Sequence, residues 1–89
     1  MRIVIFIQGE KKEVRIEVTS TQEDPFTIRN AIYELYDAKG GTESNGDAMV
    51  SGGEVYAIIE PQCKGEYRLI YTYEIADERL KTAIHITVI

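Results

Sequence analysis

The sequence predicts an all-β domain, a seven-stranded antiparallel β-sandwich formed by residues 1–89 as a single unit. Three observations predict this fold class. Apolar side chains recur at every second position in several segments, as in a strand with one buried face. These segments follow one another at spacings of about 8–12 residues with turn residues between them, which is typical of a sandwich or barrel. A chain of 89 residues supports one core and leaves little surface for a deep cleft.

The strongest alternation lies in the C-terminal third of the chain, after a turn that closes at Gly65. Bulky residues there occupy every second position: Tyr67, Leu69, Tyr71, Tyr73 and Ile75. Because successive strand side chains point to opposite faces, these five predict one buried face. A turn at Asp77 and Glu78 precedes a second alternating run. One face of that run has Thr82, Ile84, Ile86 and Val88, and the other has Ala83, His85, Thr87 and Ile89. We expect a long β-hairpin.

Four earlier segments are also predicted to be strands. The apolar run Ile3–Ile7 is rich in β-branched residues on both faces, which predicts a strand either covered on both sides or available to a partner. Strands with one wet face are predicted by the alternating sets Val14, Ile16, Val18 and Val55, Ala57, Ile59. Ala48–Val50 predict a short edge strand, whereas the polar residues 42–47 predict a solvated loop.

The segment from Phe26 to Asp37 permits two interpretations. Its apolar phase changes between Ile28 and Ala31, which favours a strand with a β-bulge near Arg29 and Asn30. A helix over residues 28–38 is the alternative, since the residue types permit it. We favour the strand because its predicted neighbours are strands.

Charge excludes several classes of partner. Ten basic and fifteen acidic residues give a net charge of −5, which opposes binding to nucleic-acid phosphates. The adjacent cations Lys11 and Lys12 are flanked by Glu10 and Glu13, so no basic patch is expected.

No segment approaches the ~20 apolar residues that span a bilayer, and no membrane insertion is expected. The first eight residues lack the apolar length and cleavage site of a signal peptide. If Met1 is the native start, we expect synthesis in a reducing cytoplasm.

No residue pattern predicts catalysis, a metal site or a cofactor. Cys63 is the single cysteine and is expected to be a partly exposed free thiol in a turn, since no base or partner ligand is near it in sequence. His85 is expected to be a surface strand residue. Glu43, Asn45 and Asp47 have the alternation of a calcium loop, but an EF-hand loop starting at Glu43 would need Gly at its sixth position, where Ala48 stands.

The six tyrosines allow two roles. Tyr67, Tyr71 and Tyr73 belong to the buried phase of the hairpin, where a ring packs in the core and its hydroxyl bonds a backbone group. The remaining three, Tyr33, Tyr36 and Tyr56, either pack at the core and rim or form an exposed aromatic patch for a sugar or a protein. Packing at core or rim is the interpretation that we favour.

The run from Gly65 to Asp77 resembles known proteins. Gly65-Glu66-Tyr67-Arg68-Leu69 is similar to the entry of strand F in immunoglobulin-like domains, where a tyrosine corner bonds back across a turn. The following residues to Asp77 resemble the F–G hairpin of bacterial immunoglobulin-like modules. The cysteine pair and tryptophan of antibody domains are absent from this sequence. The resemblance therefore implies immunoglobulin-like architecture without an inter-sheet disulfide.

The order of segments also resembles the N-terminal immunoglobulin-like domain of phage baseplate upper proteins and related small phage or prophage structural proteins. The segments that carry this likeness are Val14–Val18, Ala31–Gly40, Val55–Ile59 and the Gly65–Tyr67 hairpin entry. The resemblance implies a non-enzymatic assembly module associated with a virion. Its expected partners are other structural proteins or further copies of itself, which dock through strand edges. The alternative is a bacterial cell-surface adhesion or carbohydrate-binding module.

Overall fold

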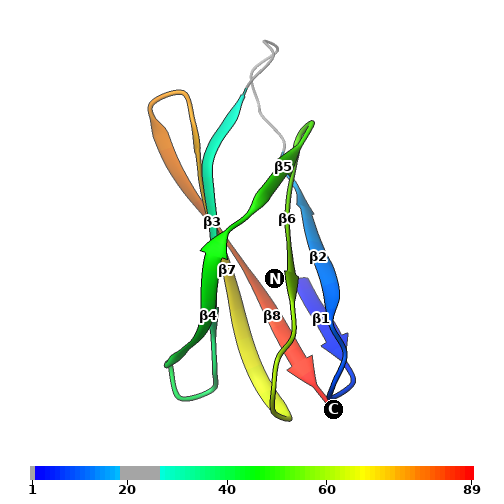
Figure 1. Cartoon of the computed structure of the whole chain (residues 1–89). Helices are drawn as coiled ribbons and strands as arrows, with labels where there is room; N and C mark the ends of the chain where they lie inside the picture. The colour runs from blue at the N-terminus through cyan, green and yellow to red at the C-terminus, as the bar shows by residue number, and fades with distance from the viewer. Residues whose placement is uncertain (1, 19–26) are drawn as a thin grey trace.

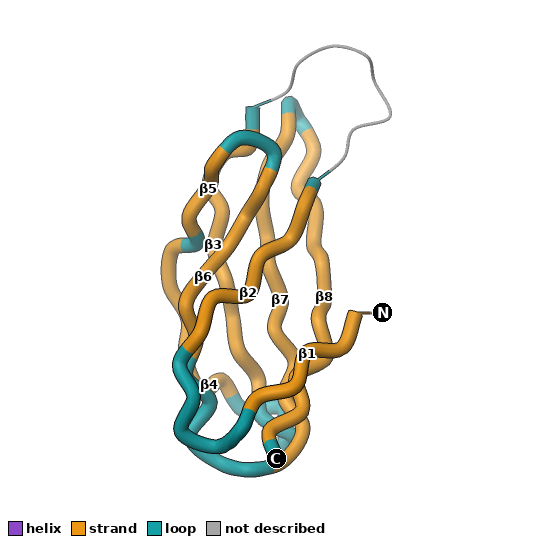
Figure 2. The backbone as a smooth tube through the Cα atoms, turned by 90° about the vertical axis from the view of Figure 1, so that its right-hand side faces the viewer, coloured by secondary structure: helices purple, strands orange, loops and turns teal. Residues whose placement is uncertain are grey.

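The computed structural model describes residues 2–18 and 27–89, which contain eight strands and no helix. The strands are β1 (Arg2–Phe6), β2 (Lys12–Glu17), β3 (Ile28–Tyr36), β4 (Thr42–Asp47), β5 (Met49–Ser51), β6 (Glu54–Ile59), β7 (Gly65–Ile75) and β8 (Glu78–Val88). They form a five-stranded sheet of order β1-β8-β7-β3-β4 and a three-stranded sheet of order β2-β6-β5. The smaller sheet lies across the larger one, and the connections gather at the two ends (Figures 1 and 2). The all-β prediction is confirmed.

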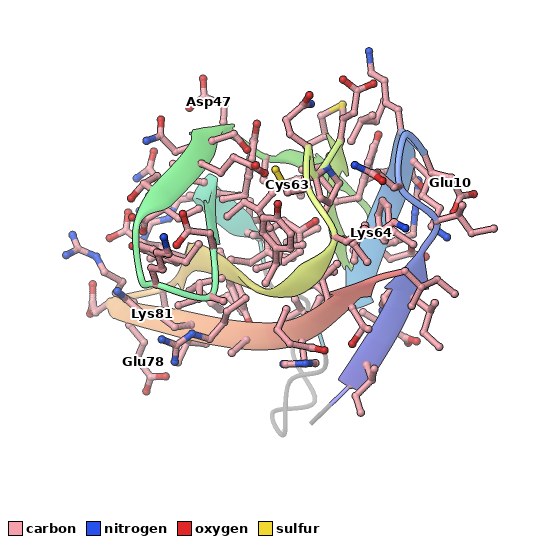
Figure 3. The ribbon with its side chains drawn as sticks, turned by 90° about the horizontal axis from the view of Figure 1, so that it is seen from below. Glu10, Asp47, Cys63, Lys64, Glu78 and Lys81 are labelled. Atoms are coloured by element: carbon pink, nitrogen blue, oxygen red, sulfur yellow. The ribbon has the colours of Figure 1, made fainter. Side chains whose placement is uncertain are left out.

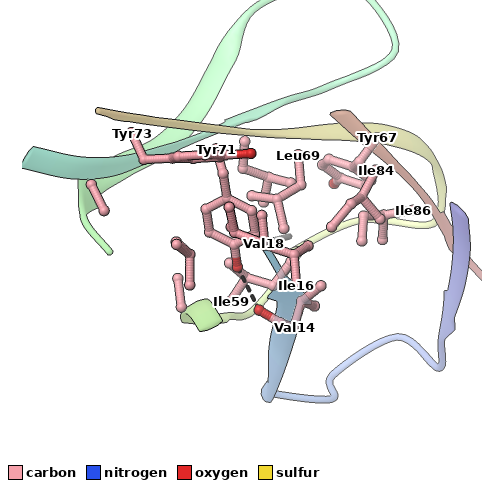
Figure 4. Packing of buried hydrophobic residues seen from close by; sticks show 14 of the residues in the cluster. Val14, Ile16, Val18, Ile59, Tyr67, Leu69, Tyr71, Tyr73, Ile84 and Ile86 are labelled. Atoms are coloured by element: carbon pink, nitrogen blue, oxygen red, sulfur yellow. Dashed lines mark hydrogen bonds between the residues drawn. The ribbon is translucent and has the colours of Figure 1, made fainter. Parts of the chain in front are cut away.

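One apolar core lies between the sheets, because each strand of the alternating type turns one face inward. Its largest buried members are Phe6, Val14, Leu35, Val55, Leu69, Tyr71, Ile84 and Ile86. Tyr71 is fully buried, and its hydroxyl donates a 2.5 Å hydrogen bond to the carbonyl of Val14 (Figure 4). This bond joins β7 of one sheet to β2 of the other. Burial raises the pKa of the Tyr71 phenol to about 12.

The predicted hairpin is present and organises the larger sheet. β7 and β8 pair over their whole lengths, from Gly65 opposite Val88 to Ile75 opposite Glu78. Of the five residues predicted to form its buried face, Tyr67, Leu69, Tyr71 and Tyr73 are buried. The fifth, Ile75, is only partly buried and packs against the core. The turn lies at Ala76 and Asp77, one residue before the predicted position.

The segment that permitted two interpretations is a strand with a bulge. The pairing of β3 with β7 shifts register between Arg29 and Ile32. Asn30 within that interval has φ = 51°, a left-handed conformation that asparagine tolerates better than most residues. The bulge reverses the phase of the strand, so that Ile28, Ala31 and Leu35 all reach the core. Phe26, where the strand was predicted to begin, lies outside the described residues.

Two parts of the prediction are wrong. Residues 42–47, predicted as a solvated loop, form a strand, β4, at the edge of the five-stranded sheet. This strand raises the total from the seven predicted to eight. Their polarity suits an edge, where charge and a short length discourage further pairing. Gly46 lies opposite Tyr33, and a Cβ on Gly46 would stand only 3.3 Å from the Tyr33 ring. The sequence did not predict β4 because strands were predicted from alternating apolar and polar residues, and β4 has no such alternation.

The second correction concerns strand direction. The sheets are not wholly antiparallel, because β1 runs parallel to β8, with Arg2 opposite Ile84 and Phe6 opposite Val88. The chain crosses to the other sheet after the turn at Gly9, so β1 and β2 are not hydrogen-bonded neighbours. β1 pairs instead with the last strand, β8, and runs in the same direction (Figure 1).

Candidate functional site: an apolar ridge on the first strand

The most unusual surface of the molecule is a row of exposed isoleucines at one edge of the five-stranded sheet. Ile3, Ile5 and Ile7 are 64%, 57% and 61% exposed, and Ile89 at the end of β8 is 60% exposed. We call these four residues the β1 ridge. Contiguous apolar surface of this kind is uncommon on a soluble protein and typically marks a contact site.

The ridge follows from the apolar character of both faces of β1. The even positions face the core, where Phe6 is fully buried and Val4 packs against the buried cluster. The odd positions therefore point outward. Pairing with β8 places Ile3 beside His85 and Ile5 beside Thr87. Of the two alternatives predicted for Ile3–Ile7, the structure shows the strand with one uncovered apolar face.

The outer edge of β1 is partly occupied by the following turn and β2. The carbonyl of Ile5 accepts a 2.8 Å hydrogen bond from Lys12 Nζ. The N–H of Ile7 donates to Glu10 Oε1 at 2.5 Å, and the carbonyl of Ile7 accepts from the N–H of Glu10 at 2.9 Å. These bonds use backbone groups that an added strand would need. They favour contact through the face of β1 over extension of the sheet along Ile5–Ile7.

Several polar side chains on β7 and β8 border the β1 ridge. Glu66 accepts hydrogen bonds from Thr87 Oγ1, at 2.9 Å, and from the His85 ring through Nε2. The Thr87 hydroxyl and the His85 imidazole hold the pKa of Glu66 below its usual value. Arg68 lies opposite His85 on β7. The border of the ridge therefore holds an acidic residue, Glu66, and a basic residue, Arg68, two positions apart on β7.

Comparison with known proteins assigns no family. No family model matches the chain, and no curated protein does. Among solved structures, the solution structure of amebosin is similar, with a TM-score of 0.47 at 15% sequence identity, over 98% of this chain and 88% of that chain. This likeness is too distant to indicate a family or a function.

The residues weighed as chemical candidates are dispersed. Cys63 is an exposed free thiol in the connection between β6 and β7, beside Lys64 (Figure 3). His85 is a strand residue of the outward face, and it contacts Glu66. Sequence reasoning missed this neighbour because Glu66 lies 19 residues away and meets His85 only across the β7–β8 ladder.

The acidic segment predicted as a solvated loop contributes one side chain to an internal network. Glu43 Oε1 accepts a 3.2 Å hydrogen bond from the Tyr67 hydroxyl. Among residues 2–18 and 27–89, no three His, Cys, Asp or Glu side chains gather as a metal site would require. No helix long and apolar enough to cross a membrane occurs in the same residues.

The three remaining tyrosines do not share a surface. Tyr33 lies opposite Tyr71 and packs against the core, while Tyr36 bonds to Glu34. Tyr56 is in the other sheet, where the Arg15 guanidinium stacks on its ring at 4.0 Å. Hydrogen bonds from Arg15 to Glu13 and Glu54 raise the guanidinium pKa and keep the charge in place. An aromatic patch built from all three tyrosines is therefore excluded.

Proposed function

We propose that the protein is a non-enzymatic assembly module that associates with further copies of itself through the β1 ridge. The observation that carries this proposal is the outward row of Ile3, Ile5 and Ile7, continued by Ile89, each more than half exposed. Fully burying an isoleucine contributes about 1.5–3 kcal/mol. Covering four residues that are each about 60% exposed therefore contributes roughly 4–7 kcal/mol per copy.

A second copy suits this surface for an electrostatic reason. The net charge of −5 opposes association in general, but the ridge itself is uncharged. Its border holds Glu66 next to Arg68 and His85, so a two-fold contact can place the acid of one copy over a base of the other. Association costs about 4–15 kcal/mol in lost freedom of motion, which makes a weak dimer, with a micromolar to millimolar dissociation constant, the expected product.

We also propose that the strand order is immunoglobulin-like. What supports this is the correspondence of β2-β6-β5 to strands B-E-D, and of β8-β7-β3-β4 to G-F-C with one added edge strand. The Tyr67 hydroxyl accepts a hydrogen bond from the N–H of Cys63, four residues earlier, as in a tyrosine corner. The first strand departs from the constant-type order, because it lies next to the last strand.

Virion association is the biological setting that we propose, on the strength of the sequence resemblance to small phage and prophage structural proteins. Such assemblies use many copies of small domains, for which weak, repeated contacts are sufficient. The neighbouring genes test this part: portal, capsid or tail genes beside the coding sequence are expected. A locus of cell-surface and secretion genes would contradict it and favour the adhesion alternative.

Sedimentation equilibrium over a wide concentration range tests the self-association. We expect the wild type to show a reversible monomer–dimer equilibrium and Ile5→Thr to shift it toward monomer, with the threonine preserving strand propensity. Ile58→Thr is the matched control, since Ile58 is 50% exposed on the outer face of β6. A wild type that is monomeric at every concentration would overturn the proposal, as would equal weakening by Ile58→Thr.

A further inference from the structure

The outward face of the five-stranded sheet has a second feature, near the start of β8 and separate from the β1 ridge. A depression of about 280 Å³ lies there over β3, β7 and β8. Its walls hold two acids, Glu34 and Glu74, and two bases, Arg79 and Lys81. Its volume lies just below the range of about 300–1,000 Å³ that is typical of small-molecule pockets, so a small ligand is the kind that it could hold.

The charges of the walls cancel, which restricts the class of ligand. Two acids and two bases sum to zero, so a simple anion would meet two carboxylates and a simple cation would meet two cations. A hydroxyl group has no such conflict, because it both donates and accepts hydrogen bonds. The lining offers carboxylate acceptors and cationic donors together. A neutral ligand with several hydroxyls fits this set.

The two carboxylates are already held in place. Glu74 accepts a hydrogen bond from Asn30 Nδ2 and lies 3.9 Å from the Arg79 guanidinium. Glu34 accepts one from the Tyr36 hydroxyl. A carboxylate has about four lone-pair sites, so each keeps acceptor capacity for a ligand. Carboxylates fixed in this way lose less side-chain entropy when a ligand binds.

Thr72 supplies the observation that points most directly to a ligand. It lies in the lining between Ile32 on β3 and Lys81 on β8, and it is only 8% exposed. Its Oγ1 is buried and has no hydrogen-bond partner among the described residues. A buried hydroxyl without a partner destabilises a protein. A ligand hydroxyl that reaches this part of the lining would give Oγ1 a partner.

We propose that this depression binds a neutral polyhydroxylated ligand of the size of one saccharide unit. Thr72 and the carboxylates of Glu34 and Glu74 bond its hydroxyls, and Ile32, 39% exposed, contacts its C–H face. The site is independent of the proposed self-association, because it shares no residue with the β1 ridge. The open, shallow form of the depression limits the contact area, so the expected affinity is in the millimolar range.

Backbone amide NMR of the full chain tests this inference. The probes are methyl glycosides of several hexoses, which represent the terminal unit of a glycan, and the same hexoses as free sugars. Acetate and ethylammonium serve as charged comparison ligands. We expect at least one glycoside or free sugar to cause saturable shifts in residues 30–34, 72–74 and 79–81, with weaker effects from both charged probes.

Two variants complete the test. Thr72→Val keeps the side-chain shape but removes the hydroxyl, and we expect it to weaken sugar binding about tenfold, the value of one hydrogen bond. Thr42→Val, on β4 and outside the depression, should bind as the wild type does. A thermal melt shows that each variant is folded. No saturable shift with any sugar, tighter binding of a charged probe, or unchanged binding by Thr72→Val would each overturn the proposal.

Discussion

The Tyr67 hydroxyl joins two segments that meet at one end of the sandwich: it accepts a 3.1 Å hydrogen bond from the backbone N–H of Cys63 and donates a 3.2 Å bond to Glu43. The first bond fastens the β6–β7 connection to the strand that follows it. The second fastens β4 to β7. Burial of the ring, opposed by the Cys63 N–H, raises the pKa of the Tyr67 phenol.

Tyr67→Phe is therefore expected to lower the free energy of unfolding by about 2 kcal/mol, because it removes two hydrogen bonds, one of them to a carboxylate. Urea unfolding at neutral pH measures this. Tyr56→Phe is the control, since the Tyr56 ring can still stack under Arg15, and it should stay within about 0.5 kcal/mol of wild type. Equal effects in the two variants would remove the structural role assigned to the Tyr67 hydroxyl.

Alkaline pH should destabilise the fold through Tyr71. Its pKa is raised from 10.0 to about 12 in the folded state, so the contribution is fully present below pH 10. It is lost as pH rises from 10 toward 12, because the unfolded chain then releases the proton more readily. Tyr71→Phe should cost about 1–2 kcal/mol at neutral pH and show a smaller loss of stability in that alkaline window. Urea midpoints at several pH values check both; an unchanged alkaline slope would contradict the assignment.

Glu66 should contribute to acid sensitivity. Its folded-state pKa lies below the usual value near 4.5, so its stabilising contribution is present above that pH. The contribution is lost as pH falls through the lowered pKa, where the folded protein must take up the proton. Glu66→Gln should therefore flatten the fall in stability below pH 4.5. The effect is expected to be small, since the side chain is 54% exposed. Thermal melts at a series of acid pH values measure it, with Glu78→Gln as the control.

Thr72→Val is expected to stabilise the protein by about 1 kcal/mol, because valine removes a buried hydroxyl that has no partner and keeps the same shape. Urea unfolding without any sugar present provides the measurement. Thr82→Val is the contrasting variant, since the Thr82 hydroxyl bonds to the Tyr73 hydroxyl at 3.0 Å. Destabilisation by Thr72→Val would show that its hydroxyl has a partner within the protein.

Much of the fold was predictable because β7 and β8 alternate so regularly. The inward set from Tyr67 to Tyr73, and the bulge near Asn30, followed from phase alone. The phase rule had no means of finding β4, whose polar residues pair with β3 through backbone groups. Nor does alternation indicate direction, so the parallel pairing of β1 with β8 became visible only when the strands were placed in one sheet.

The candidate sites were less accessible to sequence reasoning, for a reason of distance along the chain. The apolar run Ile3–Ile7 identified β1 as a strand with an unused face, but Ile89 joins it only through the β1–β8 pairing. The depression brings together Glu34, Thr72 and Lys81 from three strands. These residues lie far apart in the sequence, so no sequence motif with a fixed spacing would identify them as one site. The buried hydroxyl of Thr72 likewise appears only when its surroundings are known.

The parallel pairing of β1 with β8 also determines the order in which the chain can finish folding. Phe6 is fully buried on a strand whose hydrogen-bonded neighbour is β8, yet the ribosome makes β8 more than seventy residues later. Until then, β1 has no neighbour in its sheet, and closing so long a loop is slow. The nascent chain therefore carries an unpaired, apolar β1 until β8 has been made, and in that interval the segment is exposed to aggregation or to capture by a chaperone.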